Sequence, residues 1–142
     1  MAGVNDNLPL TMKRRGASLH SVGSYQVAGT PWLTASAISN NTILTCSFPM
    51  VSKTITVYNI GTSNDVRVHF ADDGKSGIST ANYFSIPATA AGNTLSRFTF
   101  DVKCKEFYIS ADQGAASVEV YAALTGIPTA SMMPLYGPGL DA

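Results

Sequence analysis

The two histidines and two cysteines of this 142-residue chain are the side chains best suited to nucleophilic catalysis or to zinc binding. A nucleophile needs a base within hydrogen-bond reach, and structural zinc needs four converging ligands. Neither His20 nor His69 stands in a pattern that begins such a constellation, and Cys46 and Cys104 have no CxxC or Cys/His spacing. We predict that both thiols are buried apolar fillers and that His69 points outward beside Arg67.

The carboxylates indicate no catalytic or calcium site either. Asp72 and Asp73 precede Gly74 in an acidic turn, but the spaced acidic residues and the terminal glutamate of a calcium loop are missing. Glycoside hydrolysis needs two positioned carboxylates, whereas Glu106 and Glu119 both fall within strand-like runs. Phosphate-binding glycine motifs are also absent from the sequence. We therefore predict no catalytic, metal-binding or cofactor-binding residue, and a protein that is not an enzyme.

Charge is scarce and balanced along the chain. Basic and acidic residues number nine each, and only 13% of residues are charged, about half of the usual quarter. A net charge of zero does not attract a polyanion, and the basic run Lys13–Arg15 is too short to hold a duplex, so we expect no direct nucleic-acid binding. Low surface charge is typical of subunits packed among neighbours, which favours a homo-oligomer. A polar, uncharged Ser/Thr-rich surface is the alternative explanation.

The elements that would position these residues are short β-strands. From Tyr25 onward, runs rich in β-branched and aromatic residues alternate with Gly, Asn, Asp, Ser and Pro clusters, and no segment shows a helical apolar stripe. This rhythm predicts an all-β, antiparallel β-sandwich of jelly-roll or immunoglobulin-like type. The predicted strands are Trp32–Ile38, Thr42–Phe48, Lys53–Ile60, Asp65–Ala71, Tyr83–Pro87, Leu95–Val102, Glu106–Ala111 and Ser117–Leu124.

The period-two pattern of these runs predicts one shared core. Side chains that alternate along a strand point to opposite faces, so the apolar phase of each run should be buried. Aromatic residues spread over several strands, without an obvious sugar or base platform, are expected to anchor the core and interfaces. The ten residues predicted to form the core are Ile55, Val57, Val68, Phe70, Phe98, Phe100, Phe107, Ile109, Val118 and Val120.

The two ends of the chain lack the pattern of core elements. Residues 1–24 are polar and rich in Gly and Ser, which predicts an extended N-terminal arm, and residues 126–142 contain several Pro and Gly, which predicts an irregular C-terminal tail. Residues 25–125 then form the sandwich domain. We expect both ends to make few contacts with the sandwich. No membrane-spanning run or signal peptide is recognisable, so we expect synthesis in a cytosol and no membrane partner.

Several stretches, distributed along most of the chain, carry a resemblance to a known group of proteins. They are Arg14–Val27, Gly29–Thr34, Ser52–Asn59, Val66–Phe70, Phe98–Ser110 and Ala122–Ile127. These stretches resemble small virion structural proteins of tailed bacteriophages, in particular those of marine and cyanobacterial phages. The resemblance implies a protein present in many copies in the virion, with the major capsid protein or other virion proteins as partners, and it carries over no catalytic residue.

Two functions from different classes follow from these expectations. The first is a capsid decoration or cement protein that bridges capsid subunits and stabilises the phage head, with the phage tail as the next location. The second is a receptor-binding or carbohydrate-binding module at the particle surface, which would need aromatic and amide or carboxylate side chains gathered at one loop end of the sandwich. A cell-wall hydrolase has no support in the sequence.

Overall fold

A computed structural model describes residues 29–71, 82–89, 95–130, 132–135, 137 and 139–140. These residues form eight strands, and none of them belongs to a helix long and apolar enough to cross a membrane. Each strand overlaps one of the predicted ranges, which confirms the all-β expectation. The predicted N-terminal arm, residues 1–24, lies outside the described residues. The strands are β1 (Pro31–Ile38), β2 (Thr42–Ser47), β3 (Met50–Asn59), β4 (Val66–His69), β5 (Phe84–Ile86), β6 (Arg97–Phe100), β7 (Glu106–Ala111) and β8 (Ala116–Pro128).

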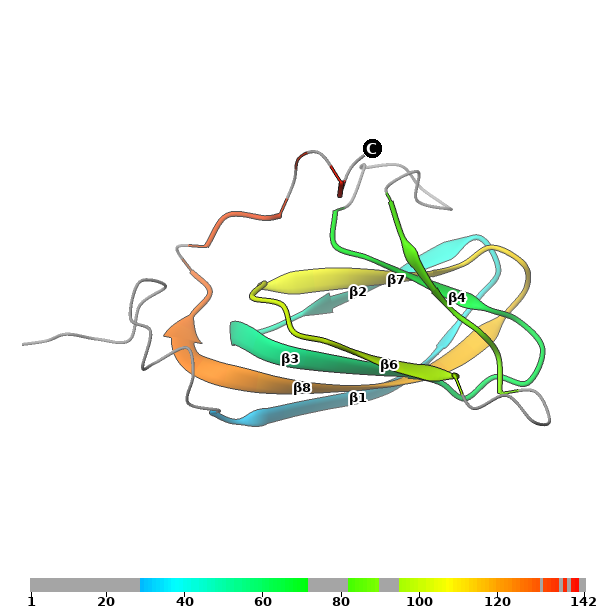
Figure 1. The fold of residues 1–142 in the computed structure, drawn as a ribbon, viewed down its shortest axis with the longest axis horizontal. Helices are drawn as coiled ribbons and strands as arrows, with labels where there is room; N and C mark the ends of the chain where they lie inside the picture. Colours follow the sequence, from blue (N-terminus) through cyan, green and yellow to red (C-terminus); the bar gives the residue numbers. More distant parts are fainter. Residues whose placement is uncertain are drawn as a thin grey trace, which may run out of the picture.

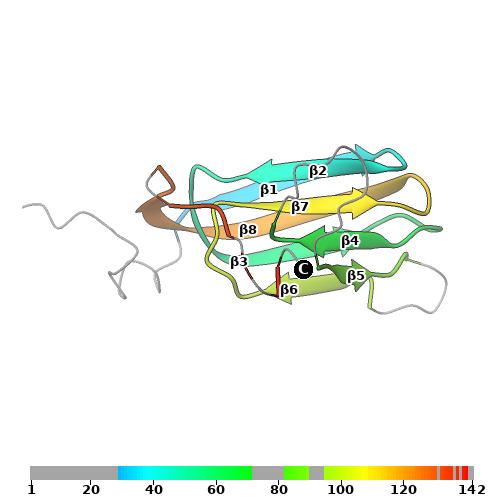
Figure 2. The ribbon, with the colours of Figure 1, turned by 90° about the horizontal axis from the view of Figure 1, so that it is seen from above.

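The strands form two four-stranded antiparallel sheets, in the orders β1-β8-β3-β6 and β2-β7-β4-β5. The sheets lie face to face, with β1 next to β2 along one side and β6 beside β5 along the other (Figures 1 and 2). Every link between consecutive strands crosses from one sheet to the other, except β4 to β5. This eight-stranded arrangement is a jelly roll, the first of the two sandwich types expected from the sequence.

A row of aromatic rings runs through the interior from the β1 side to the β6 side. Trp32 meets Phe48 edge-on with ring centroids 5.0 Å apart, Phe48 stacks on Phe107 at 5.8 Å, and Phe107 lies 6.3 Å from Phe70. Phe70 then contacts Phe100 at 5.5 Å. Because these rings come from both sheets, their packing holds the two layers together.

Nine of the ten predicted core residues are buried or partly buried, and Phe98 is the exception. Phe98 is 43% exposed, while seven of the others are almost fully buried and Phe70 and Phe100 are partly buried. The register places Phe98 opposite the buried Val57, but β6 is an edge strand and β5 facing it has only three residues. Phe98 therefore lies at the open side of the sandwich, with its ring centroid 4.5 Å from that of Phe84, where no further strand formed by the described residues covers it.

The last strand continues beyond its predicted end at Leu124, so the expectation that no strand includes Gly126 is wrong. β8 runs to Pro128 because β3 already starts at Met50, and the extra residues are accommodated by shifts in the β3–β8 register. The hydroxyl of the buried Thr125 donates to the carbonyl oxygen of Val51 at 2.8 Å and accepts from the N–H of Ile127 at 3.2 Å. Sequence periodicity does not reveal such an irregular register.

Beyond β8, the C-terminal segment crosses above the β2-β7-β4-β5 sheet (Figures 1 and 2). Leu135 packs against the hydrophobic core, and the carbonyl oxygen of Leu140 accepts a hydrogen bond from the N–H of Asn82 at 3.0 Å. The expectation that the C-terminal tail makes few contacts with its own sandwich is therefore wrong for the described residues. Leu135 gives an otherwise Pro- and Gly-rich segment an apolar side chain to bury.

Candidate functional site

The outer faces of the two sheets differ in how far their side chains are exposed. On the β2-β7-β4-β5 sheet, the outward-facing His69, Tyr108 and Ser110 are all buried. On the β1-β8-β3-β6 sheet, by contrast, Leu33 is 71% exposed and Tyr121 is 43% exposed. Since large apolar side chains on a bare face have no partner within the described part of the chain, this second face is the candidate functional surface.

His69 is not the outward surface residue expected from the sequence. It is 1% exposed, its ring stacks on Tyr108 with centroids 5.5 Å apart, and its Nδ1 lies 3.1 Å from the carbonyl oxygen of Ala71. Arg67 forms an ion pair with Asp112 and places its guanidinium 4.2 Å from the centre of the Tyr83 ring. The alternation placed both side chains on the correct face, but it could not show that this face is covered.

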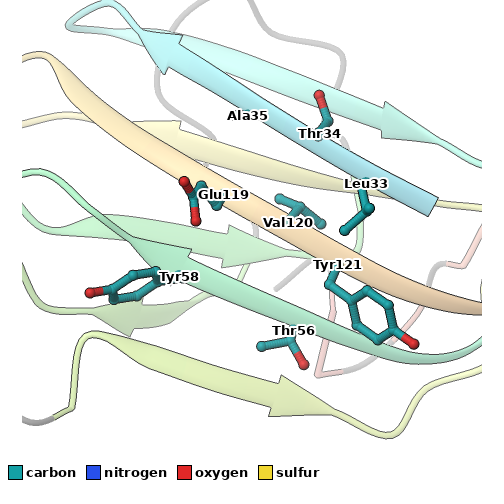
Figure 3. A pocket seen from close by; sticks show the side chains of 8 residues that line it. All are labelled: Leu33, Thr34, Ala35, Thr56, Tyr58, Glu119, Val120 and Tyr121. Carbon is teal, nitrogen blue, oxygen red and sulfur yellow. The ribbon is translucent and has the colours of Figure 1, made fainter. Parts of the chain in front are cut away.

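A groove of about 450 Å³ crosses the exposed sheet face (Figure 3). Two cross-strand rows build it, since antiparallel register aligns outward-facing residues of β1, β8 and β3. In the first row, Tyr121 lies between Leu33 and Thr56, and in the second, Glu119 lies between Ala35 and Tyr58. The residues that line the groove are Leu33, Thr34, Ala35, Thr56, Tyr58, Glu119, Val120 and Tyr121.

The chemistry of the groove is mainly apolar and aromatic. Figure 3 shows Tyr58 and Glu119 toward one end and Leu33 and Tyr121 toward the other. Glu119 is the only charged lining residue, and Arg97 of β6 lies opposite Tyr58 in the register. A broad groove with two tyrosines, one carboxylate and several hydroxyls offers a ligand both apolar contact and hydrogen bonds.

The two cysteines are buried, as predicted. Burial raises the pKa of Cys46 to about 12 and that of Cys104 to about 11, so both thiols stay protonated near neutral pH. Cys104 also interacts with Ser52, whose hydroxyl lies 3.4 Å from the sulfur and donates to the carbonyl oxygen of Val102 at 2.7 Å. Both thiols are therefore free, protonated side chains inside the fold.

The two glutamates considered as candidates lie in different sheets. Glu106 is half-buried on β7, opposite Ser47, whereas Glu119 is exposed on β8 in the other sheet. His20, Asp72 and Asp73 lie outside the described residues. Within residues 29–71, 82–89 and 95–130 and the described C-terminal positions, no group of three His, Cys, Asp or Glu side chains is placed to hold a metal ion.

The groove residues were not selected from the sequence as a site. Alternation does place Leu33, Tyr58 and Tyr121 on the outward phase of their strands. Their meeting depends on β8 lying between β1 and β3, although β8 is the last strand of the chain and the other two are among the first. A long-range strand order of this kind leaves no local signal in one sequence.

Comparisons with known proteins do not assign a family to this chain. No protein-family model and no curated protein matches it. Among solved structures, the chain has a low similarity to RmlC from Streptococcus suis in complex with dTDP-D-xylose, with a TM-score of 0.38 and 8% sequence identity. The match covers 66% of this chain and 43% of that protein, so the chain spans less than half of its length. A similarity at this level assigns no function.

Proposed function

We propose that this protein is a structural component of a bacteriophage virion, a capsid decoration or cement protein that binds capsid subunits through the exposed face of the β1-β8-β3-β6 sheet. The observation that carries the proposal is the exposure of Leu33 and Tyr121 side by side on that face. A face of this kind is stabilised when a protein partner covers its apolar side chains. The sequence resemblance supplies the virion as the setting.

The scarcity of charge supports the same interpretation. The groove contains one charged residue among its eight lining residues, so a partner would have little charge to desolvate when it covers the face. A standard interface buries about 800 Å² on each partner, and weak individual contacts add up when many copies bind a regular lattice. A decoration protein therefore does not need a deep pocket or a strong charge pattern to remain bound.

The fold is compatible with the proposal but does not select it. Jelly rolls occur in viral capsid proteins and also in lectin domains and cupins. Function has to be argued from the surface, because the same sandwich supports unrelated activities. On the exposed face, the described residues form no metal-binding cluster, and Glu119 is the one charged residue among those that line the groove.

The experiment that tests this proposal locates the protein in purified particles of the phage that encodes it. Quantitative mass spectrometry of heads and tails, separated by centrifugation, measures the copy number per particle. Antibody labelling viewed by electron microscopy shows where the copies lie. We expect many copies on the head surface. A protein found only in the infected cell, or in a few copies at the tail tip, would contradict the decoration function.

One observation favours the second candidate, a carbohydrate-binding module on the particle. Tyr58, Tyr121 and Glu119 gather in the same groove with Thr56, and aromatic rings beside hydroxyl and carboxylate groups provide apolar contact together with hydrogen bonds. This cluster lies on a sheet face and not at the loop end where it was expected. Its presence makes glycan binding a specific alternative at the same site.

Binding assays with the isolated protein separate the two functions. For a glycan site, Tyr58→Ala and Tyr121→Ala should abolish retention on host surface polysaccharide, while an exposed variant outside the groove, Met133→Ala, should not. For a decoration protein, the same polysaccharide should show no saturable binding at all. Saturable binding that depends on both tyrosines would establish the second function in place of the first.

A further inference from the structure

The outer edge of β1 has the features of a strand that pairs with another strand. β1 is eight residues long and lies at the edge of its sheet, and no strand formed by the described residues pairs with its far side. Edge strands of soluble proteins are usually protected by charged residues, bulges or short length. β1 contains no charged residue, and its pairing with β8 proceeds without a register shift.

The other three edges of the sandwich are protected more strongly or are shorter. β5 has three residues, and β6 has four and includes Arg97. β2 has six residues and lies beside β1 in the opposite sheet, and it also lacks charge. In the sequence, no Asp, Glu, Lys or Arg occurs between Arg15 and Lys53. The side of the sandwich formed by β1 and β2 therefore brings no like charges together when two copies meet there.

The hydrogen bonds between β1 and β8 determine which backbone groups of β1 point toward its free edge. The N–H of Leu124 donates to the carbonyl oxygen of Thr30 at 3.2 Å, and on the other side of β8 the N–H of Ile60 donates to the carbonyl oxygen of Ser117 at 3.0 Å. Backbone groups in an antiparallel strand alternate between its two neighbours. Even-numbered residues of β1 therefore bond to β8, and the backbone groups of odd-numbered residues point away from it. Those residues are Pro31, Leu33, Ala35 and Ala37.

We propose that two copies of this chain pair through β1 in antiparallel orientation about a two-fold axis at Ala35. In this register Ala35 faces Ala35 of the second copy, and Leu33 of each copy faces Ala37 of the other. Each of these pairs exchanges both N–H···O bonds, which gives about six backbone hydrogen bonds. Pro31, which has no N–H, lies at the start of the strand with its ring nitrogen toward the free edge, where proline is tolerated.

Side-chain size favours a second copy as the occupant of this edge. The exposed Leu33 side chain lies opposite a small alanine, so each leucine covers part of the other copy's face without a clash. The four-stranded sheets of the two copies then become one continuous sheet. The inference goes beyond the proposed function, because it concerns how copies of the chain join one another and can be measured without any virion component.

Analytical ultracentrifugation of the full-length protein over increasing concentration tests this pairing. We expect a reversible monomer–dimer equilibrium. Ala35→Pro removes an N–H that faces the free edge, so it should weaken dimerisation by about tenfold or more while the circular dichroism and the melting temperature of the monomer are retained. Ala35→Ser keeps this N–H and should dimerise as the original protein does. A protein that stays monomeric at concentrations up to about 1 mM, which corresponds to a very weak dissociation constant, would overturn the proposal.

Engineered cysteines test the register of the proposed β1–β1 pairing. This test does not depend on whether the Ala35→Pro variant folds. Directly paired residues have Cα atoms about 5.5 Å apart, within the range of a disulfide, whereas residues four positions out of register are too distant. Mild oxidation should therefore link Ala35→Cys into a covalent dimer, and Ala37→Cys should remain unlinked. The native Cys46 and Cys104 are buried and give a low background. Equal linking of both variants, or linking of Ala37→Cys alone, would overturn the proposed pairing.

Discussion

The side-chain amide of Asn59 donates a hydrogen bond of 3.2 Å to the carbonyl oxygen of Ile86, which ties the end of β3 to β5 in the opposite sheet. The same nitrogen donates to the carbonyl oxygen of Asn64 at 3.0 Å, and Oδ1 accepts from the N–H of Gly61 at 3.0 Å. Asn59 is fully buried. A polar residue on the buried phase of a strand is thus explained by the backbone groups that it satisfies where the chain leaves β3.

Replacing this side chain should be strongly destabilising. Asn59→Ala leaves the carbonyl oxygens of Asn64 and Ile86 and the N–H of Gly61 without these bonds, so we expect the free energy of unfolding to fall by about 2–4 kcal/mol. Urea unfolding followed by tryptophan fluorescence measures the change. The exposed Asn40→Ala serves as the control, with an effect within about 0.5 kcal/mol. Equal effects of the two substitutions would show that the amide network does not stabilise the fold.

A matched pair of glycines tests the geometry of the loop between β7 and β8. Gly114 has a φ of 143°, and a Cβ there would lie 2.5 Å from Nδ2 of Asn64. Gly114→Ala should therefore destabilise the protein by about 1–3 kcal/mol. A Cβ added at Gly126 would meet no atom within 4 Å, so Gly126→Ala should be close to neutral. Melting temperatures of the two variants make the comparison, and a neutral Gly114→Ala would contradict this loop geometry.

Much of this fold could be predicted from the sequence because strand periodicity is a local property. The alternation around Val57 and Phe107 identified buried positions correctly, since both strands lie within their sheets and are covered by the other layer. Phe98 has the same alternation but lies on an edge strand, and His69 lies on an outer face that is nevertheless covered. Burial at these two positions depends on neighbours distant in sequence, which no local pattern encodes.

Alkaline pH should destabilise the protein through its two buried thiols. Burial raises the pKa of Cys46 from 9.0 to about 12 and that of Cys104 to about 11, the latter against a smaller lowering by the Ser52 hydrogen bond. Above pH 9.0 the unfolded chain loses these protons while the folded chain keeps them, so the free energy of unfolding falls as pH rises. Below that pH the thiols are protonated in both states and contribute no pH dependence.

The expected loss is roughly 1 kcal/mol per pH unit for each thiol over the range between its unfolded and folded pKa values. Urea unfolding at about pH 8 and about pH 10.5, two conditions on either side of the unfolded pKa, measures it. Tyrosines and lysines also titrate in this range, so the informative quantity is the difference between the original protein and a Cys46→Ala, Cys104→Ala double variant. The double variant should lose less stability on the same pH change; an identical loss would contradict the assigned cause.

The candidate site was less predictable than the fold. Strand alternation predicts that Leu33, Tyr58 and Tyr121 each point outward, yet the sequence does not show that the three side chains share one surface. The jelly-roll order brings the last strand between the first and third, and this placement creates the groove. The sequence-based expectation of a loop-end cluster was reasonable for a binding module, because loops usually carry function on β-sandwiches.

We propose that the exposed face of the β1-β8-β3-β6 sheet attaches this protein to a phage head. Two apolar side chains of nearly equal exposure permit a matched test, since Leu33 is 71% exposed on this face and Met133 is 69% exposed outside the groove. The same substitution, to aspartate, can be made at either position. Neither change removes a buried group, so both variants should fold.

Rebinding to heads stripped of the protein is the most direct measurement. Binding isotherms are recorded for the original protein, Leu33→Asp and Met133→Asp, and DNA release on heating reports head stability. We predict that the original protein and Met133→Asp bind in saturating amounts and raise the temperature of DNA release. Leu33→Asp should bind at least about tenfold more weakly, because a buried, unpaired carboxylate would replace an apolar contact. Equal binding of all three proteins, or no binding by any of them, would contradict the claim.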